Sequence, residues 1–208
     1  TKLDFSLVKP YIKVIGFTML LPIAFAAINR SILTGVSFAM CFIAMTTGYT
    51  FSVTEKNSMD RLYGILPIKK SEMVTGRYLF VLALGAMALV VSLITQPIVL
   101  RAMGESVGTL DMISAAVGGL FLFALYTVFQ IPGYYKYGAI KGRVFMYIPV
   151  AGFLATLFFL PKMPADNPVL STVVSSPVLL IGLVLVLVVV MYAVSIWFSI
   201  RIMENKEM

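Results

Sequence analysis

The chain has 208 residues, of which 60% are apolar and only 12% are charged. Soluble domains carry about 25% charged residues, so this composition excludes a soluble globular domain and predicts an integral membrane protein. The single cysteine, Cys41, and the absence of histidine argue against an internal disulfide and against a metal site built on either residue type. We therefore expect this chain itself to bind no metal and no cofactor.

The N-terminal segment, residues 1–10, mixes apolar and basic side chains and is too short and polar to cross a bilayer. Leu3 and Phe5 stand among Lys2 and Lys9, and Pro10 follows. This mixture is typical of a helix that lies in the membrane interface. We predict such a helix over residues 1–10.

Six apolar runs follow, each near the roughly 20 residues that a helix needs to cross about 30 Å of hydrocarbon. They predict an all-α membrane protein with one transmembrane domain that covers residues 1–208. The last run is nearly uniform in bulky aliphatic residues and is expected to face lipid, whereas Gly85, Gly118 and Gly119 are expected where helices approach closely. The predicted spans are 11–28, 31–53, 78–99, 112–130, 145–160 and 177–200.

Basic residues are divided unequally between the connections of these spans. Arg30, Arg101 and Lys162 lie in the connections after the first, third and fifth spans, and the other thirteen of the sixteen lie at the termini or in the two remaining connections. Because translocation of flanking Lys and Arg is disfavoured, both termini and both charged loops are predicted to face the cytoplasm. We attribute the net charge of +7 to this topology and to attraction to anionic lipid, not to nucleic-acid binding.

The predicted spans hold almost no ionisable side chain, which argues against a proton-coupled transporter or an ion pump. Their hydroxyl and amide groups, Thr127 and Gln130 among them, suit hydrogen bonds between helices or the lining of a route. In the second span, side chains at three- and four-residue spacing share a face that would suit apolar or amphipathic cargo, although ordinary packing gives the same pattern. The candidate route-lining residues are Phe38, Phe42, Met45, Thr46 and Tyr49.

The one long charged segment inside the chain is residues 53–78, which carry eight of its 25 charged residues. Leu62 and Leu66 present an apolar side opposite Asp60 and Arg61, and Pro67 ends the pattern. We predict a short amphipathic helix along the membrane within the loop 54–77, and the restart of a helix near Ser71. Such a helix can enter a groove on a partner protein while the flanking charges fix its register.

Two segments carry a resemblance to a known family. Two runs resemble the two cytoplasmic motifs of bacterial type 2 ABC exporter permeases, in particular the small six-span branch common in Gram-positive bacteria. They are E-K-N-S-M-D-R-L-Y-G-I-L-P-I-K-K-S-E-M-V-T-G-R-Y from Glu55 to Tyr78 and Q-I-P-G-Y-Y-K-Y-G-A-I-K-G-R from Gln130 to Arg143. The spacing of the two motifs, the number of spans and the chain length also agree with that branch, so the resemblance covers essentially the whole chain. Met59 stands where that family usually has tryptophan, and Gly133 where a larger residue is frequent.

The resemblance implies a half-transporter in the bacterial plasma membrane, in which two permeases, identical or paralogous, assemble with two separate ABC ATPase subunits. The chain has no G-x-x-x-x-G-K-[ST] phosphate loop, so it is not itself expected to be an enzyme, and ATP and Mg are expected on the partner. The residues implied to couple to the ATPase are Glu55, Lys56, Asn57, Asp60, Arg61, Leu62, Leu66 and Pro67. The second cytoplasmic motif is Pro132, Tyr135, Lys136, Gly138, Lys141 and Arg143.

The predicted function is export of hydrophobic or amphipathic cargo, such as a peptide, an antimicrobial or a lipid-like molecule. One alternative is a membrane partner of an ABC ATPase that does not transport, for example an immunity or sensory subunit, and reconstituted transport would separate the two. An intramembrane enzyme is disfavoured because the chain has no histidine and its acidic residues are confined to loops.

Overall fold

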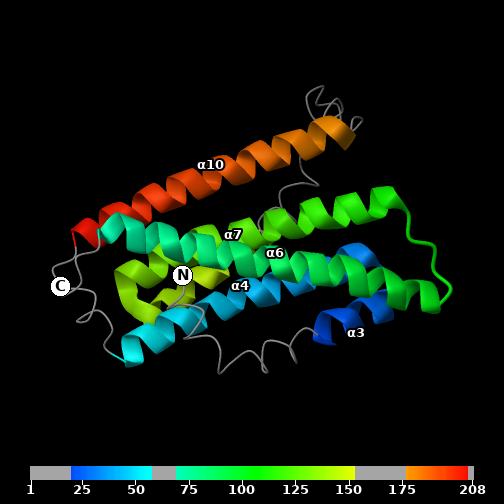
Figure 1. The fold of residues 1–208 in the computed structure, drawn as a ribbon, viewed down its shortest axis with the longest axis horizontal. Coiled ribbons are helices and arrows are strands. Elements are labelled where there is room, and N and C mark those ends of the chain that lie inside the picture. The colour runs from blue at the N-terminus through cyan, green and yellow to red at the C-terminus, as the bar shows by residue number, and fades with distance from the viewer. Residues whose placement is uncertain (1–19, 58–68, 153–176, 206–208) are drawn as a thin grey trace.

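The computed structural model describes residues 20–57, 69–152 and 177–205. These residues form only helices and connections, as the all-α prediction requires. The long helices run along the longest axis of the molecule (Figure 1). The elements are α3 (Leu20–Asn29), α4 (Ile32–Lys56), α6 (Lys70–Ala102), α7 (Thr109–Lys141), the 3-10 helix η2 (Gly142–Met146) and α10 (Pro177–Glu204).

Four helical stretches are long and apolar enough to cross a membrane, which makes the chain a multi-pass membrane protein. They are residues 32–56, 70–102, 109–152 and 179–204. α3 is apolar but has only 10 residues, so it represents part of the predicted first span. The predicted fifth span, 145–160, is helical as far as residue 152, and its remainder lies outside the described residues together with the interfacial segment 1–10.

The helices extend further toward the charged loops than the apolar runs indicate. α4 continues to Lys56, and α6 begins at Lys70, eight residues before the predicted third span and one before the predicted restart at Ser71. α7 continues through Pro132 to Lys141, well past the predicted end at residue 130. Helix N–H and C=O groups are paired within the helix, so a helix can continue past the end of its apolar run where its side chains still find contacts.

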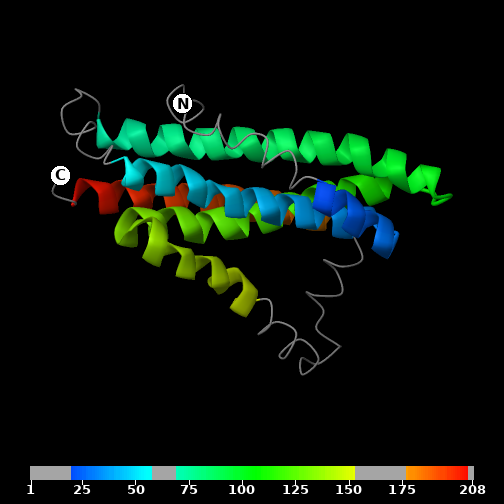
Figure 2. The same cartoon turned by 90° about the horizontal axis from the view of Figure 1, so that it is seen from below.

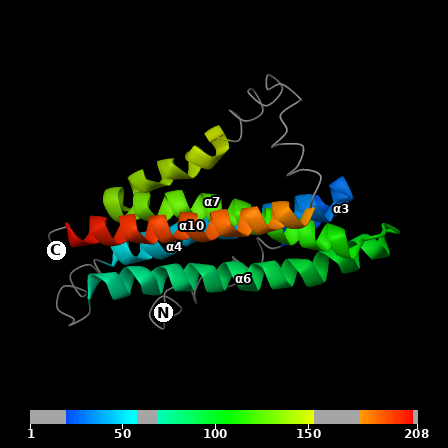
Figure 3. The same cartoon turned by 90° about the horizontal axis from the view of Figure 1, so that it is seen from above.

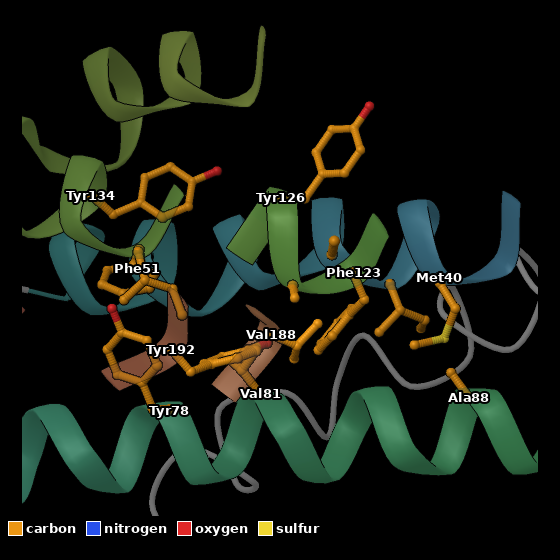
Figure 4. Packing of buried hydrophobic residues seen from close by; sticks show 14 of the residues in the cluster. Met40, Phe51, Tyr78, Val81, Ala88, Phe123, Tyr126, Tyr134, Val188 and Tyr192 are labelled. Atoms are coloured by element: carbon orange, nitrogen blue, oxygen red, sulfur yellow. The ribbon is translucent and has the colours of Figure 1, made fainter. Parts of the chain in front are cut away.

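The core lies where α7 packs against α4, α6 and α10. Figure 4 shows Val81 of α6, Phe123 of α7 and Val188 of α10 gathered between the helices, and all three are buried. α10 buries only a narrow face, and side chains such as Val189, which is 68% exposed, cover the rest of it. That exposure is what a lipid-facing span requires.

Polar side chains join the helices inside this core. The Tyr78 hydroxyl lies 2.6 Å from Ser195 Oγ, and the Thr127 hydroxyl lies 2.6 Å from Tyr192 Oη. Gln130, predicted as a polar group of the spans, is fully buried and accepts a 3.1 Å hydrogen bond from the Thr47 hydroxyl. Hydrogen bonds of this kind hold helices together where lipid removes the hydrophobic driving force.

Basic residues gather at one end of the bundle. Of the ten basic residues in the described part of the chain, only Arg30 and Arg101 lie at the other end, where Arg30 Nη1 forms a 3.1 Å ion pair with Glu105 Oε1. The ends of α4, α7 and α10 and the start of α6 lie together at the basic end (Figure 1). The segregation agrees with the predicted topology, and assignment of this end to the cytoplasm stays a prediction.

Glycines allow the closest helix contacts, as the sequence predicts. A Cβ atom added to Gly119 would lie 2.8 Å from Val36 Cγ1, and one added to Gly85 would lie 2.6 Å from Phe123 Cζ. Gly118 is less crowded, since its added Cβ would lie 3.3 Å from Leu33 Cδ1. The contact of α4 with α7 therefore depends on the missing side chain at Gly119.

Replacement of Gly119 by leucine is expected to separate α4 from α7 and to cost about 1–3 kcal/mol of stability, as overpacking does. Gly182→Leu is the matched control, because an added Cβ at Gly182 meets no atom within 4 Å. Thermal unfolding of the purified variants in detergent measures the difference. Equal unfolding temperatures for the two variants would contradict the packing at Gly119.

Candidate coupling site at the ends of α4, α6 and α7

The two motifs that are far apart in the sequence meet at the basic end of the bundle. The backbone N–H of Ala139 donates a hydrogen bond of 2.6 Å to Glu55 Oε2, which joins the last turn of α4 to α7. The two residues are 84 positions apart. Hydrogen bonds to an ionised carboxylate are about twice as strong as neutral ones, so this contact fixes the two ends firmly.

The backbone conformation of Gly138 leaves the Ala139 N–H available to Glu55. Its backbone has φ 78° and ψ 177°, a conformation open essentially to glycine alone, and it divides the α7 helix in two. The first N–H groups after such a break have no partner within their helix. A carboxylate at that position satisfies one of them and also suits the positive end of the helix dipole.

The segment after the break folds back at an angle to α7, as Figures 2 and 3 show for η2 and the helical residues up to 152. A Cβ atom at Gly138 would lie 3.2 Å from both carboxylate oxygens of Glu55. The position therefore requires glycine for its backbone angles and for the approach of Glu55. We call Glu55, Gly138 and Ala139 the joint.

Arg77, in the first turns of α6, ties the start of that helix to α4 and α7. Its side chain is only 6% exposed, and its Nη2 donates a 3.1 Å hydrogen bond to Thr54 Oγ1. The guanidinium carbon lies 4.4 Å from the centre of the Phe51 ring and 6.0 Å from that of Tyr135. Arginine suits this position because its planar group can stack on a ring and donate hydrogen bonds together.

Aromatic rings and glycines pack closely where the chain turns back after α7. The Phe51 ring packs on Tyr134 with centroids 4.9 Å apart. An added Cβ at Gly133 would lie 2.7 Å from Phe145 Cγ, and one at Gly142 would lie 2.6 Å from Tyr134 Cδ1. The Phe145 ring thus fills the space that a side chain at Gly133 would take.

The predicted coupling residues are only partly described. Glu55 and Lys56 form the last turn of α4, and Asn57 is its C-cap. Only Glu55 of these three belongs to the joint. Asp60, Arg61, Leu62, Leu66 and Pro67 lie outside the described residues.

The second predicted motif lies around the joint. Pro132 is inside α7, Tyr135 is buried against Phe51, and Gly138 is the break itself. Lys136 and Lys141 are exposed. Arg143, in η2, donates a long 3.4 Å hydrogen bond to Ser52 Oγ and so adds a second link to α4.

The predicted route-lining residues share the outer face of α4, away from the core. Phe38, Met45 and Tyr49 are 38%, 38% and 45% exposed, and Phe42 and Thr46 are partly exposed. Phe38 stacks on Phe25 of α3 with ring centroids 4.4 Å apart. The shared face is as expected, and a route along it stays a prediction. In the described part of the chain, no group of three or more His, Cys, Asp or Glu side chains could hold a metal ion.

Comparison with known families covers nearly the entire chain. Residues 1–204 match the family model of the ABC-2 family transporter protein. The chain belongs to the ABC-2 transporter family. No curated protein and no solved structure matches it. Membership makes this ABC-2 protein a membrane permease subunit of an ABC transporter and implies an ABC ATPase as its partner.

Arg77 was not among the predicted coupling residues of this ABC-2 protein. The sequence singles it out only as the basic residue before Tyr78 at the end of the first motif that carries the family resemblance. Its role follows from burial and from partners on two other helices, neither of which a local pattern reveals.

Arg77→Ala is expected to destabilise the protein by about 1.5–3 kcal/mol, because a buried hydrogen bond from a charged donor is lost. Arg77→Lys should rescue only part of the loss, since lysine cannot stack on Phe51 and donate to Thr54 in the same way. Arg101→Ala is the control on the same helix, where the side chain is exposed. Chemical unfolding of the detergent-solubilised variants measures the costs, and a wild-type midpoint for Arg77→Ala would contradict the assigned contacts.

Proposed function

We propose that this chain is the permease subunit of an ABC exporter that moves hydrophobic or amphipathic cargo, such as a peptide, an antimicrobial or a lipid-like molecule, out of the cell. ATP is hydrolysed on a separate subunit. Family membership supports the permease assignment. The nature of the cargo rests on spans that are nearly free of ionisable side chains and on the apolar outer face of α4.

The observation that carries the proposal is the hydrogen bond between Glu55 and Ala139. Glu55 begins the segment that the resemblance assigns to the ATPase contact, and Ala139 begins the segment after the Gly138 break. A displacement of the first segment therefore moves the second directly, through one short contact. The joint converts ATPase movement at the membrane surface into movement of the helical segment 139–152.

Arg77 joins the two ends of the coupling loop 54–77. Thr54 and Arg77 stand at its two ends and are joined by a 3.1 Å hydrogen bond. The loop thus leaves and re-enters the bundle at one place, so force on it reaches α4 and α6 together. The Phe51 ring packs on both Arg77 and Tyr134, and so links the ends of the loop to α7 as well.

In the complete transporter, two permease chains, copies or paralogues, stand above two ATPases in the plasma membrane of a Gram-positive bacterium. The basic end faces the cytoplasm, and in the predicted topology both termini do as well. The face of α4 that carries Phe38, Met45 and Tyr49 turns toward the route between the permeases. ATP-driven closure of the ATPases rocks α3, α4 and the segment 139–152 to open a cavity outward.

Glu55→Ala is expected to lower the ATPase activity that depends on the permease about fivefold, the factor that matches the ~1 kcal/mol of a lost helix cap. Glu55→Gln keeps an acceptor oxygen, so its ATPase activity should lie between that of the wild type and that of Glu55→Ala. The measurement uses the permease and its ATPase reconstituted together in vesicles. Glu204→Ala is the control, because it removes an exposed carboxylate at the same end of the bundle.

Unchanged ATPase activity in Glu55→Ala would contradict the coupling role. A folded Glu55→Ala permease is established separately by its elution and unfolding temperature. If the wild-type pair hydrolysed ATP but moved neither an amphipathic peptide nor a fluorescent lipid analogue, the result would favour the non-transporting partner.

A further inference from the structure

A groove of about 310 Å³ lies beside the joint, between the second half of α7, η2 and α10. Its walls run from Val128 to Tyr137 on α7 and from Val194 to Ile202 on α10, with the Phe145 ring on a third side. The volume is at the lower end of the roughly 300–1,000 Å³ of small-ligand sites.

The interior of the groove gives water little to bind. Ser195 is its polar residue on α10, and the Ser195 hydroxyl already donates to the Val128 carbonyl at 2.8 Å and lies 2.6 Å from Tyr78 Oη. The remaining α10 residues that line the groove are apolar. Apart from Lys136 and Tyr137 at one end, the side chains that line the groove offer water no free partner, so an alkyl chain fits its interior better than water does.

A single cation marks one end of the groove. Lys136 lines it, is exposed, and has its Nζ 5.3 Å from the centre of the Tyr137 ring. That ring stacks on Phe145 with centroids 5.4 Å apart. Among the described residues that line the groove none is acidic, so nothing in it neutralises Lys136. Lysine and tyrosine placed together in this way are typical of the membrane interface.

The length of the groove matches a lipid tail. Val128 and Lys136 are eight residues apart on α7, and so are Val194 and Ile202 on α10, which corresponds to about 12 Å of helix in each case. Half of the hydrocarbon core of a bilayer is about 15 Å. A tail that begins at Lys136 would therefore run through most of one leaflet inside the groove.

We propose that this groove is a binding site for an anionic phospholipid, with one acyl chain between α7 and α10 and the phosphate on Lys136. The site goes beyond the proposed function and rests on it only for the leaflet, which is the cytoplasmic one in the predicted orientation. Anionic lipids are concentrated there and attract basic residues near the surface. The bound lipid lies against the segment that follows the joint.

The test is native mass spectrometry of the purified, delipidated full chain titrated with phosphatidylglycerol or with phosphatidylcholine of the same tails. Lys136→Ala removes the phosphate contact, and Lys141→Ala is its control, an exposed lysine outside the groove. Val194→Phe fills the groove, and Val189→Phe is its control on the same helix, at a more exposed position. Each variant is first checked for the wild-type unfolding temperature.

We expect phosphatidylglycerol binding to fall about fivefold in Lys136→Ala, the factor for one basic residue at an anionic surface. Val194→Phe should lower it at least as much, both controls should bind as wild type does, and phosphatidylcholine should bind less than phosphatidylglycerol. Equal binding of the two lipids, or loss in Val194→Phe but not in Lys136→Ala, would overturn the headgroup site. Wild-type binding in all variants would overturn the groove altogether. The measurement needs neither ATPase nor cargo, so its failure and that of the proposed function are distinguishable.

Discussion

The arrangement of the basic end depends on one hydrogen bond, from the Ala139 N–H to the carboxylate of Glu55. That N–H is available because Gly138 takes backbone angles that end one helical segment and start another. Without the break, the Ala139 N–H would be used within α7, and α4 would have no backbone group to hold. Without the carboxylate, the break would leave an unpaired N–H at the start of the second segment.

Contacts elsewhere in the bundle pack α4, α6, α7 and α10 against one another. Glycine at 119 lets α4 and α7 touch, and hydroxyl pairs such as Thr127 with Tyr192 join α7 to α10 inside the core. Arg77 holds the start of α6 against the same end of α4. In the proposed mechanism, a displacement delivered at the end of α4 passes through the joint to the segment after Gly138. Membrane helices use small residues and hydrogen bonds for such packing because lipid offers no hydrophobic gain.

Composition and apolar runs predict the membrane class, the long helices and the close approach at Gly85 and Gly119, because these depend on local pattern and on side-chain size. The extension of α7 to Lys141 was missed because Lys136 and Lys141 resemble loop residues, while Tyr134 and Tyr135 beside them remain buried and hold the helix. The joint could not be predicted, since it connects a side chain to a backbone N–H 84 residues away. The residues of both motifs were identified by resemblance, but their contact comes only from the fold.

The central claim is that Glu55 and the start of the second segment move as one unit. Cys41 is the single cysteine, so a Cys41→Ser background allows Glu55→Cys and Ala139→Cys to be introduced as the only pair. The measurement is the permease-dependent ATPase activity of this pair, reconstituted with its ATPase, before and after oxidation to a disulfide. The account predicts that the fraction of the protein that cross-links regains the activity lost with Glu55. A cross-linked fraction whose activity stays at that of the reduced pair, or falls below it, would contradict the account.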